Sequence, residues 1–313
     1  MELYNEYELI SHSKLADCTI FTVDMVYRPM HLHKEMELCC VLSGTCSIYT
    51  DRRSFTAGPG DALLFDTGSG HEIWASGLPA RIVSLQISPS FCKRFFPQLR
   101  NIRFDTCRLS QCMDTAQLQQ LREMMLRALS AYLGDTPDSA FACMGQINLI
   151  FSMLLQLIPY HTLSDTEITT QTRNAERMHR ILHYLENHYT ESIRLSEIAE
   201  SEGLTQTYLS HLFKQQLHIS FQEYLSRLRL EAAMILLRQS EITLTDAAYA
   251  CGFSDPKYLN QSFQKNTGMT PKQWLQSAQR AQDSGVQTAG DSRTTQRILT
   301  PAECRVLLQN HGL

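Results

Sequence analysis

The 313-residue chain lacks several features that would assign it to other classes of protein. Its ten cysteines contain no C-x-x-C pair, which argues against a zinc ribbon or a thioredoxin-type redox centre. No apolar stretch reaches about 18 residues, and no basic start precedes an apolar run of signal-peptide length. We therefore expect a cytoplasmic protein with no membrane partner, whose cysteines are reduced and mostly serve as small core residues.

Positive charge is also scarce. The formal net charge is −4, and residues 1–172 hold 13 Lys or Arg against 18 Asp or Glu. Residues 173–280 are only weakly basic, with 12 Lys or Arg against 11 Asp or Glu. A nucleic-acid-binding module usually has a stronger basic excess, and few phosphate contacts release few counterions. Tight DNA binding by this chain would therefore need a dimer or a ligand-favoured geometry.

A helical pattern is written twice in the C-terminal half. The first copy is LSEIAESEGLTQTYLSHLFKQQLHISFQEYL from Leu195, and the second is LTDAAYACGFSDPKYLNQSFQKNTGMTPKQWL from Leu244. Each copy has a short helix, a turn containing Gly203 or Gly252, and a second helix, which predicts a helix-turn-helix. An ordinary helical bundle is the alternative for one copy, but a bundle does not need to rebuild the same turn.

The second helix of each copy has an apolar inner side and a polar outer side. We expect Thr205 to cap the second helix of the first copy. In the second copy, Thr243 with Asp246 is expected to cap the first helix, and Ser254, followed by Pro256, is expected to cap the second helix. Polar side chains of this kind can reach base edges or phosphates in the DNA major groove. The candidate DNA-binding residues are Gln206, Thr207, Ser210, His211, Lys214, Lys257, Asn260, Gln261, Gln264 and Lys265.

The N-terminal half contains a set of residues with metal-ligand spacing. His31, His33 and Glu37 precede Gly44 in an H-x-H-x3-E-x6-G pattern, and His71 follows after Gly68. Residues i and i+2 of a strand share a face, so these side chains can converge on Zn, Ni, Fe or Mn. An organic effector pocket or simple hydrogen bonding at a barrel mouth are the alternatives, and Glu35 can replace Glu37 as the acid. Further candidate pocket walls are Arg28, Tyr49 and Trp74, with Tyr27 and Phe65 nearby in sequence.

Short strand-like runs before residue 105 predict a small β-barrel or sandwich with helices attached at its end: Thr19–Tyr27, Glu37–Leu42, Cys46–Thr50, Asp61–Asp66 and Arg81–Ile87. The segment from Ser110 to Tyr160 changes to helical periodicity. Its stripe of Leu118, Leu121, Met125, Ala128 and Tyr132 is expected either to form a dimer contact or to pack on the barrel. Residues 161–175 have the polar composition of a linker. After residue 280 the chain is polar, and Thr300, Pro301 and Gly312 predict a short terminal helix.

The stretches LSEIAESEGL, YLSHLFK, RLRLEAAMILL and ITLTDAAYACGFSDPKYLNQSFQKNTGMTP resemble the DNA-binding domain of AraC/XylS-type transcription regulators. The H-x-H-x3-E-x6-G set resembles the first cupin motif, whereas the second motif is partial, with Asp66 in place of Pro and Ala75 in place of Asn. These resemblances imply an α+β multidomain protein. The expected parts are a cupin-like barrel (1–109), a helical dimerisation segment (110–160), a linker (161–175), a double helix-turn-helix domain (176–280) and a flexible tail with a short helix (281–313).

The function implied by the resemblance is that of a homodimeric, non-enzymatic, sequence-specific regulator that binds promoter DNA and contacts RNA polymerase. It would be an activator controlled by a sugar or small acid in the cupin barrel. Two alternatives stay open from the sequence. One is a metal-dependent cupin enzyme with a helical appendage, and the other is a regulator that responds to no ligand.

Overall fold

The structure, a computed structural model, describes residues 14–50, 54–75, 78–217, 219–239, 242–267, 269–276 and 295–313. The residues around Tyr4 and Tyr7, for which the family resemblance implies an N-terminal arm that can fold over a ligand, and the tail segment 281–294 lie outside the described residues. The chain divides into two units, which we describe separately. Among the described residues, the barrel unit contains residues 14–173 and 296–313, and the helical unit contains the residues from Asn174 to Thr295.

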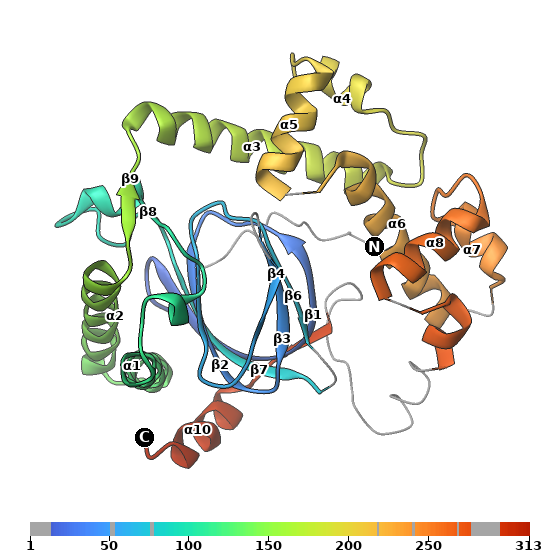
Figure 1. Cartoon of the computed structure of the whole chain (residues 1–313). Coiled ribbons are helices and arrows are strands. Elements are labelled where there is room, and N and C mark those ends of the chain that lie inside the picture. Colours follow the sequence, from blue (N-terminus) through green and yellow to red (C-terminus); the bar gives the residue numbers. More distant parts are fainter. Residues whose placement is uncertain are drawn as a thin grey trace. The chain divides into compact units, whose positions relative to one another are not determined.

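The barrel unit is built on one antiparallel sheet that curves into a nearly closed barrel (Figure 1). Its strand order is β4-β3-β6-β1-β7-β2-β5, and β10 pairs with β1 outside this path. The sequence located most of these strands but missed β4, β6 and β10. The strands are β1 (Cys18–His31), β2 (Met36–Ser43), β3 (Cys46–Thr50), β4 (Ser54–Ala57), β5 (Ala62–Phe65), β6 (His71–Ala75), β7 (Ala80–Ile87) and β10 (Thr295–Ile298).

Alternation along the strands separates two cores, because successive side chains of a strand point to opposite faces. On β2, Cys39 and Val41 join the core inside the barrel, whereas Leu38 and Cys40 join the core on its outer face. The outer core is completed by the helices α1 (Thr115–Leu133) and α2 (Pro137–Leu157). The expected fold class is confirmed. Short 3-10 helices at Pro97–Asn101 and Leu109–Gln111 lead into α1.

The apolar stripe of α1 packs inside its own chain. Leu121, Met125, Ala128 and Tyr132 are buried in the outer core, and Leu118 packs against it. The predicted dimer contact at this stripe is therefore wrong, and the alternative, packing on the barrel, is right. Heptad-like spacing alone could not distinguish the two, since both bury the same face of the helix.

Helix α2 is long and apolar enough to pass as a membrane span, contrary to the expectation that no such stretch exists. An 18-residue window of it has a mean hydropathy of 1.6, and 33% of that window is buried. Its inner side, including Ile147, Ile150 and Leu154, lies in the outer core. A core helix meets the same criteria as a span, so composition alone is weak evidence for a membrane.

The segment expected to be a linker is regular structure. Strand β9 (Tyr160–Thr162) pairs with β8 (Ile102–Phe104), and α3 (Asp165–His188) continues from the barrel unit into the helical unit. Its first turns are exposed, which explains why their polar composition resembled that of a linker. Its later part is anchored by the buried Met178, Ile181, Leu182 and Leu185.

The helical unit contains the two predicted helix-turn-helix copies. Helices α4 (Leu195–Ser201) and α5 (Gln206–Leu217) form the first, and α7 (Leu244–Ala250) and α8 (Pro256–Thr267) form the second, with α6 (Phe221–Gln239) between them. Gly203 and Gly252 turn the chain with positive φ angles of 67° and 84°. Such angles favour glycine because it has no Cβ.

Two of the three caps predicted in the helical unit are confirmed. The Oγ1 of Thr205 accepts from the backbone N–H of Tyr208 at 3.1 Å, and that of Thr243 accepts from Asp246 at 3.1 Å. At α8, however, the Oδ1 of Asp255 accepts from the N–H of Lys257 at 2.8 Å. Asp255 therefore takes the capping role predicted for Ser254, because it directly precedes the helix.

The last described residues return to the barrel unit. Strand β10 pairs with β1, and α10 (Pro301–Asn310) follows it. The predicted terminal helix is confirmed, including the cap, since the Oγ1 of Thr300 accepts from the N–H of Glu303 at 3.3 Å. The pairing of β10 was not predicted, because a four-residue polar strand gives no local signal for a partner far away in sequence.

Candidate effector site and DNA interface

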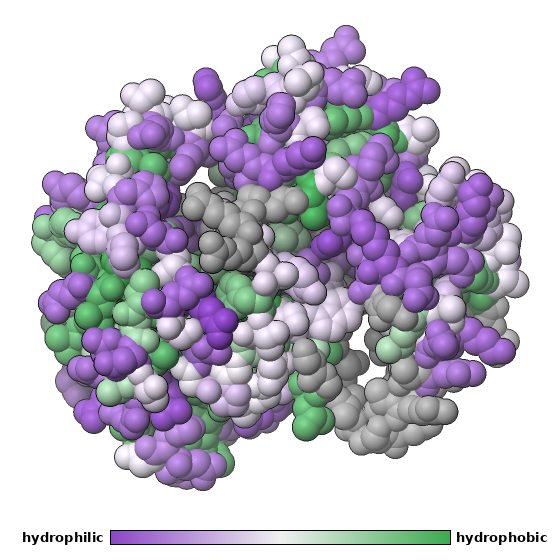
Figure 2. All heavy atoms as spheres, viewed as in Figure 1, coloured by the Kyte–Doolittle hydropathy of each residue, from purple (hydrophilic) through white to green (hydrophobic). Residues whose placement is uncertain are grey.

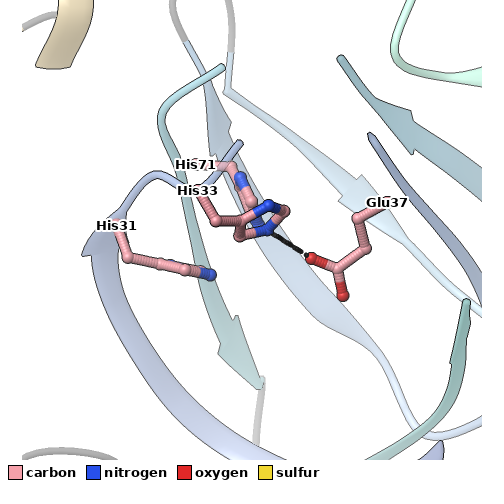
Figure 3. A group of neighbouring side chains, drawn as sticks. All are labelled: His31, His33, Glu37 and His71. Atoms are coloured by element: carbon pink, nitrogen blue, oxygen red, sulfur yellow. Dashed lines mark hydrogen bonds and ion pairs between the residues drawn. The ribbon is translucent and has the colours of Figure 1, made fainter. Parts of the chain in front are cut away.

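Four buried side chains converge at one end of the barrel (Figure 3). His31 ends β1, His33 lies in the loop after it, Glu37 lies on β2, and His71 begins β6. One ligand atom from each residue lies within 4.8 Å of those from the others. The β1–β6 register shifts between Arg28 and His31, and His31 then pairs directly with His71. The predicted set is thus brought together in the fold.

Each histidine is held by its Nδ1 atom. The Nδ1 of His31 donates to the carbonyl of Pro29 at 2.9 Å, that of His33 to Glu35 at 3.0 Å, and that of His71 to Ser69 at 3.0 Å. A carbonyl can only accept, so these contacts place a proton on Nδ1 and direct the three Nε2 atoms elsewhere. Histidines that bind a metal through one ring nitrogen are usually oriented in this way, by a hydrogen bond from the other ring nitrogen.

Glu37 lies between two of these rings. Its Oε2 is 2.9 Å from the Nε2 of His33 and 3.5 Å from the Nε2 of His71. Burial alone would raise the pKa of Glu37, but the rings of His33 and His71, which share a proton with its carboxylate through Nε2 when no metal is bound, outweigh burial and hold that pKa well below its usual value. The site therefore contains a buried carboxylate anion, which favours a cation among the nitrogens.

Burial has the opposite effect on the fourth residue. It lowers the pKa of His31 well below the usual value, and the charges of His71 and Arg28 add to this effect. His31 is therefore neutral, the form that can bind a metal through Nε2. Its ring centroid lies 4.1 Å from that of His71.

The donor set fits a divalent transition metal. Two ligands bound at about 2.0–2.2 Å and separated by about 90–109° are roughly 2.8–3.6 Å apart. The two Glu37–histidine distances of 2.9 and 3.5 Å lie within this range. Three imidazoles and one carboxylate suit Zn, Ni, Fe or Mn without selecting one. Glu35 does not take part, because its Oε2 lies beside the Nδ1 of His33, at 3.9 Å, on the side away from the cluster.

The other predicted pocket residues divide between the two faces of the sheet. Arg28 is opposite the interior residue Ile73 and acts electrostatically on His31, so it belongs near the site. Trp74 follows Ile73 on β6 and therefore points outward, where its ring lies 4.5 Å from that of Tyr27. Tyr49 follows the interior Ile48 on β3, also points outward, and is 43% exposed.

Residues not predicted from the sequence support the cluster. Ser84 on β7 donates through Oγ to the Oε1 of Glu37, and the Sγ of Cys39 lies 3.5 Å from the same oxygen. Burial and the neighbouring Glu37 raise the pKa of Cys39 well above its usual value, so it remains a thiol. Phe65 stacks on His71 with ring centroids 3.9 Å apart. The one available signal was Ser84 itself, a polar residue in the apolar run of β7.

The ten candidate DNA-binding residues all lie on the outer sides of α5 and α8. Ser210 is half-buried, and the other nine are exposed. The inner sides bury Leu209, Leu212 and Phe213 on α5, and Leu259 and Phe263 on α8. Within the helical unit, Lys265 also donates to Glu223 of α6 at 3.0 Å. The other candidate side chains of α8 form an exposed polar strip along the helix: Lys257, Asn260, Gln261 and Gln264.

Sequence comparisons connect both units with known proteins. Residues 18–142 match the model of the AraC-like ligand binding domain, and residues 198–277 match a helix-turn-helix domain. The chain is 25% identical over 237 residues to an uncharacterised HTH-type transcriptional regulator of Staphylococcus aureus, covering 75% of this chain and 30% of that protein. It is 32% identical over 157 residues to the transcriptional activator RhaS of Escherichia coli, covering 50% and 53% of the two chains.

The chain thus spans about a third and about half of the lengths of these two relatives. Among solved structures, ToxT from Vibrio cholerae aligns with 83% of this chain and 97% of its own, at 12% identity and a TM-score of 0.40. The two matched regions fall on different units of the fold, the first on the barrel and α1 and the second on the paired helix-turn-helix copies. On this basis the chain belongs to the AraC family of helix-turn-helix transcription regulators.

Proposed function

We propose that the chain is a sequence-specific DNA-binding transcription regulator, in which α5 and α8 each enter the major groove. The observation that carries this proposal is the repeated division of these helices into a buried apolar side and an exposed polar side. Asn260, Gln261 and Gln264 suit paired hydrogen bonds to adenine, whereas Lys214 and Lys257 suit phosphates.

Replacing His211 and Gln261 together by alanine is expected to weaken specific DNA binding by roughly tenfold or more, because each base contact contributes about 1–3 kcal/mol. Binding is measured by fluorescence anisotropy on a fragment selected by the intact protein from random duplexes. The matched control is Gln222→Ala, which removes an exposed glutamine of α6. Unchanged affinity of the double variant, at an unchanged melting temperature, contradicts the assignment of these helices.

We propose that the effector unit is the barrel, and that the ligand occupies the end containing His31, His33, Glu37 and His71. Arg28, near His31, favours a ligand with a carboxylate or several hydroxyls, in keeping with a small acid or a sugar. A divalent transition metal held by the three histidines and Glu37 forms part of this proposal. A ligand-free regulator is the alternative, and it predicts no change in melting temperature with any small acid, sugar or metal.

The proposal assigns no catalysis to the metal cluster. Support comes from the relatives, which are regulators by name, and from the placement of the cluster in a unit that matches a ligand-binding domain. A cupin-type enzyme would require turnover of a substrate by metal-loaded protein. The proposed setting is the cytoplasm and the proposed action is activation, in agreement with the name of the transcriptional activator RhaS. Contact with RNA polymerase is part of the same proposal.

The regulator is proposed to be a homodimer that pairs through the outer face of α2. This face carries Phe141, which is 81% exposed, and Leu149, which is 55% exposed. No charged residue occurs from 139 to 160, and apolar side chains lie exposed over this helix (Figure 2). A neutral face can meet its own copy without like-charge repulsion, so a second copy of this chain fits it better than a charged partner does.

Phe141→Glu is expected to convert the dimer into a monomer, because each copy would place a carboxylate in the apolar contact. Sedimentation velocity at micromolar concentration measures the change. Phe95→Glu, which alters a phenylalanine 69% exposed elsewhere on the barrel unit, is the control and should remain dimeric. A Phe141→Glu protein with the same sedimentation coefficient as the parent contradicts this interface.

A further inference from the structure

The C-terminal strap, defined as residues 295–313, is an integral part of the barrel unit. Leu299, Cys304, Leu307 and Leu308 are buried in the same core as the inner residues of α1. Their neighbour Val306 is 58% exposed, so the strap has a clear inner and outer side. An apolar inner side matched to the outer core indicates a specific docked position.

Polar contacts fix the register of the strap on β1. The N–H of Leu299 donates to the carbonyl of Thr22 at 2.8 Å, and Arg297 donates to the Oδ2 of Asp24 at 2.8 Å. Asp24 also accepts from Arg81 of β7 at 2.7 Å, and Arg297 also binds Glu303. The strap is therefore joined to two strands, and it covers a strand edge that would otherwise expose backbone N–H and C=O groups.

The chain connects the barrel unit and the helical unit twice. The helical unit follows the barrel unit through α3, and the chain then returns to the barrel unit at the strap. The helical unit is thus attached to the barrel unit at both of its ends. A second attachment limits the arrangements that a unit can explore, in the way that closing a loop does.

Strand β1 connects the strap with the candidate effector site. It is one strand of 14 residues, with Thr22 and Asp24 under the strap and His31 at the cluster. We propose that the strap is a regulatory contact, whose docking on β1 restrains the helical unit and so sets its affinity for DNA. This inference rests on the proposed function, and it assigns the control to a segment beyond the matched regions.

The test uses the full-length chain with a protease recognition sequence inserted after Gly285. Cleavage leaves every side chain of both units in place and removes only the covalent return to the barrel. We expect the cut strap to stay bound during gel filtration, the radius of gyration from small-angle X-ray scattering to increase, and DNA affinity to change at least about threefold. Leu307→Asp, which undocks the strap, should change affinity in the same direction, whereas Val306→Asp should not.

Equal scattering and equal DNA affinity before and after cleavage overturn the inference. If the uncut protein selects no DNA, the proposed function fails, while the scattering comparison still decides whether the strap restrains the helical unit. Should Leu307→Asp fail to fold, the cut protein alone answers the question, because its sequence in both units is intact.

Discussion

Gly252→Ala is expected to lower the free energy of unfolding of the helical unit by about 3 kcal/mol or more, whereas Gly203→Ala costs about 1 kcal/mol. Both glycines turn the chain after the first helix of a helix-turn-helix, and both have positive φ angles. They differ in their surroundings. A Cβ on Gly252 would lie 2.7 Å from the carbonyl oxygen of Tyr189 and 2.8 Å from the Cα of Thr190, whereas one on Gly203 meets no heavy atom within 4 Å.

The atoms that obstruct Gly252 belong to the backbone, so they cannot rotate away as a side chain could. That backbone is itself held in place, since Arg229 of α6 donates to the carbonyls of Tyr189 and Glu191, each at 2.7 Å. Urea unfolding of the two variants, followed by circular dichroism, measures the difference. If both variants lost a similar free energy of unfolding, the contact of a Cβ at position 252 with the backbone of Tyr189 and Thr190 would contribute little to stability.

Glu37→Gln is expected to lower the affinity of the barrel unit for a divalent transition metal on the order of 100-fold or more, since loss of even an outer partner of a ligand costs about 10–100-fold. The substitution preserves the shape of the side chain and removes the negative charge that the cluster contains. Titration calorimetry with ZnCl₂ and with MnCl₂, and elemental analysis after dialysis, measure the effect. Glu123→Gln, which changes an exposed glutamate of α1, is the matched control.

An intact protein that retains neither metal would reject the metal part of the proposal and leave an organic effector as the occupant of the site. If Glu37→Gln and the intact protein bound metal with equal affinity, the metal would bind at a site other than this cluster. Near-UV circular dichroism of the variant establishes that its fold is unchanged. His188→Ala provides a second comparison, because it removes a half-buried histidine of α3 whose ring contacts Tyr184 and Glu191 and lies outside the cluster.

Much of the fold could be predicted from local patterns, because alternation and helical periodicity record which face of an element is buried. Strand β3 was located at its observed bounds from its alternating run. Strand β6 was missed because its sequence, HEIWA, mixes a buried histidine and glutamate with apolar residues and so lacks clear alternation. The helical start of α3 was missed because its exposed first turns carry no apolar stripe.

The candidate site shows the same division between local and distant information. The spacing of His31, His33 and Glu37 lies within one short stretch and could be recognised directly. The role of Ser84 depends on the pairing of β2 with β7, in which Cys39 is opposite Ser84, and no local pattern specifies that register. The outward direction of Trp74 and Tyr49 likewise follows from strand pairing and could not be known from their nearness in sequence.

The return of the last residues to β1 also sets an order for biosynthesis. Asp24 and Arg297 are 273 residues apart, so at about 5–20 residues per second the ribosome needs roughly 14–55 s to add Arg297 after Asp24. The barrel can be completed only after the entire helical unit has emerged. During that interval the edge of β1 that the strap later covers has no partner strand from this segment, so its backbone N–H and C=O groups can pair with another strand.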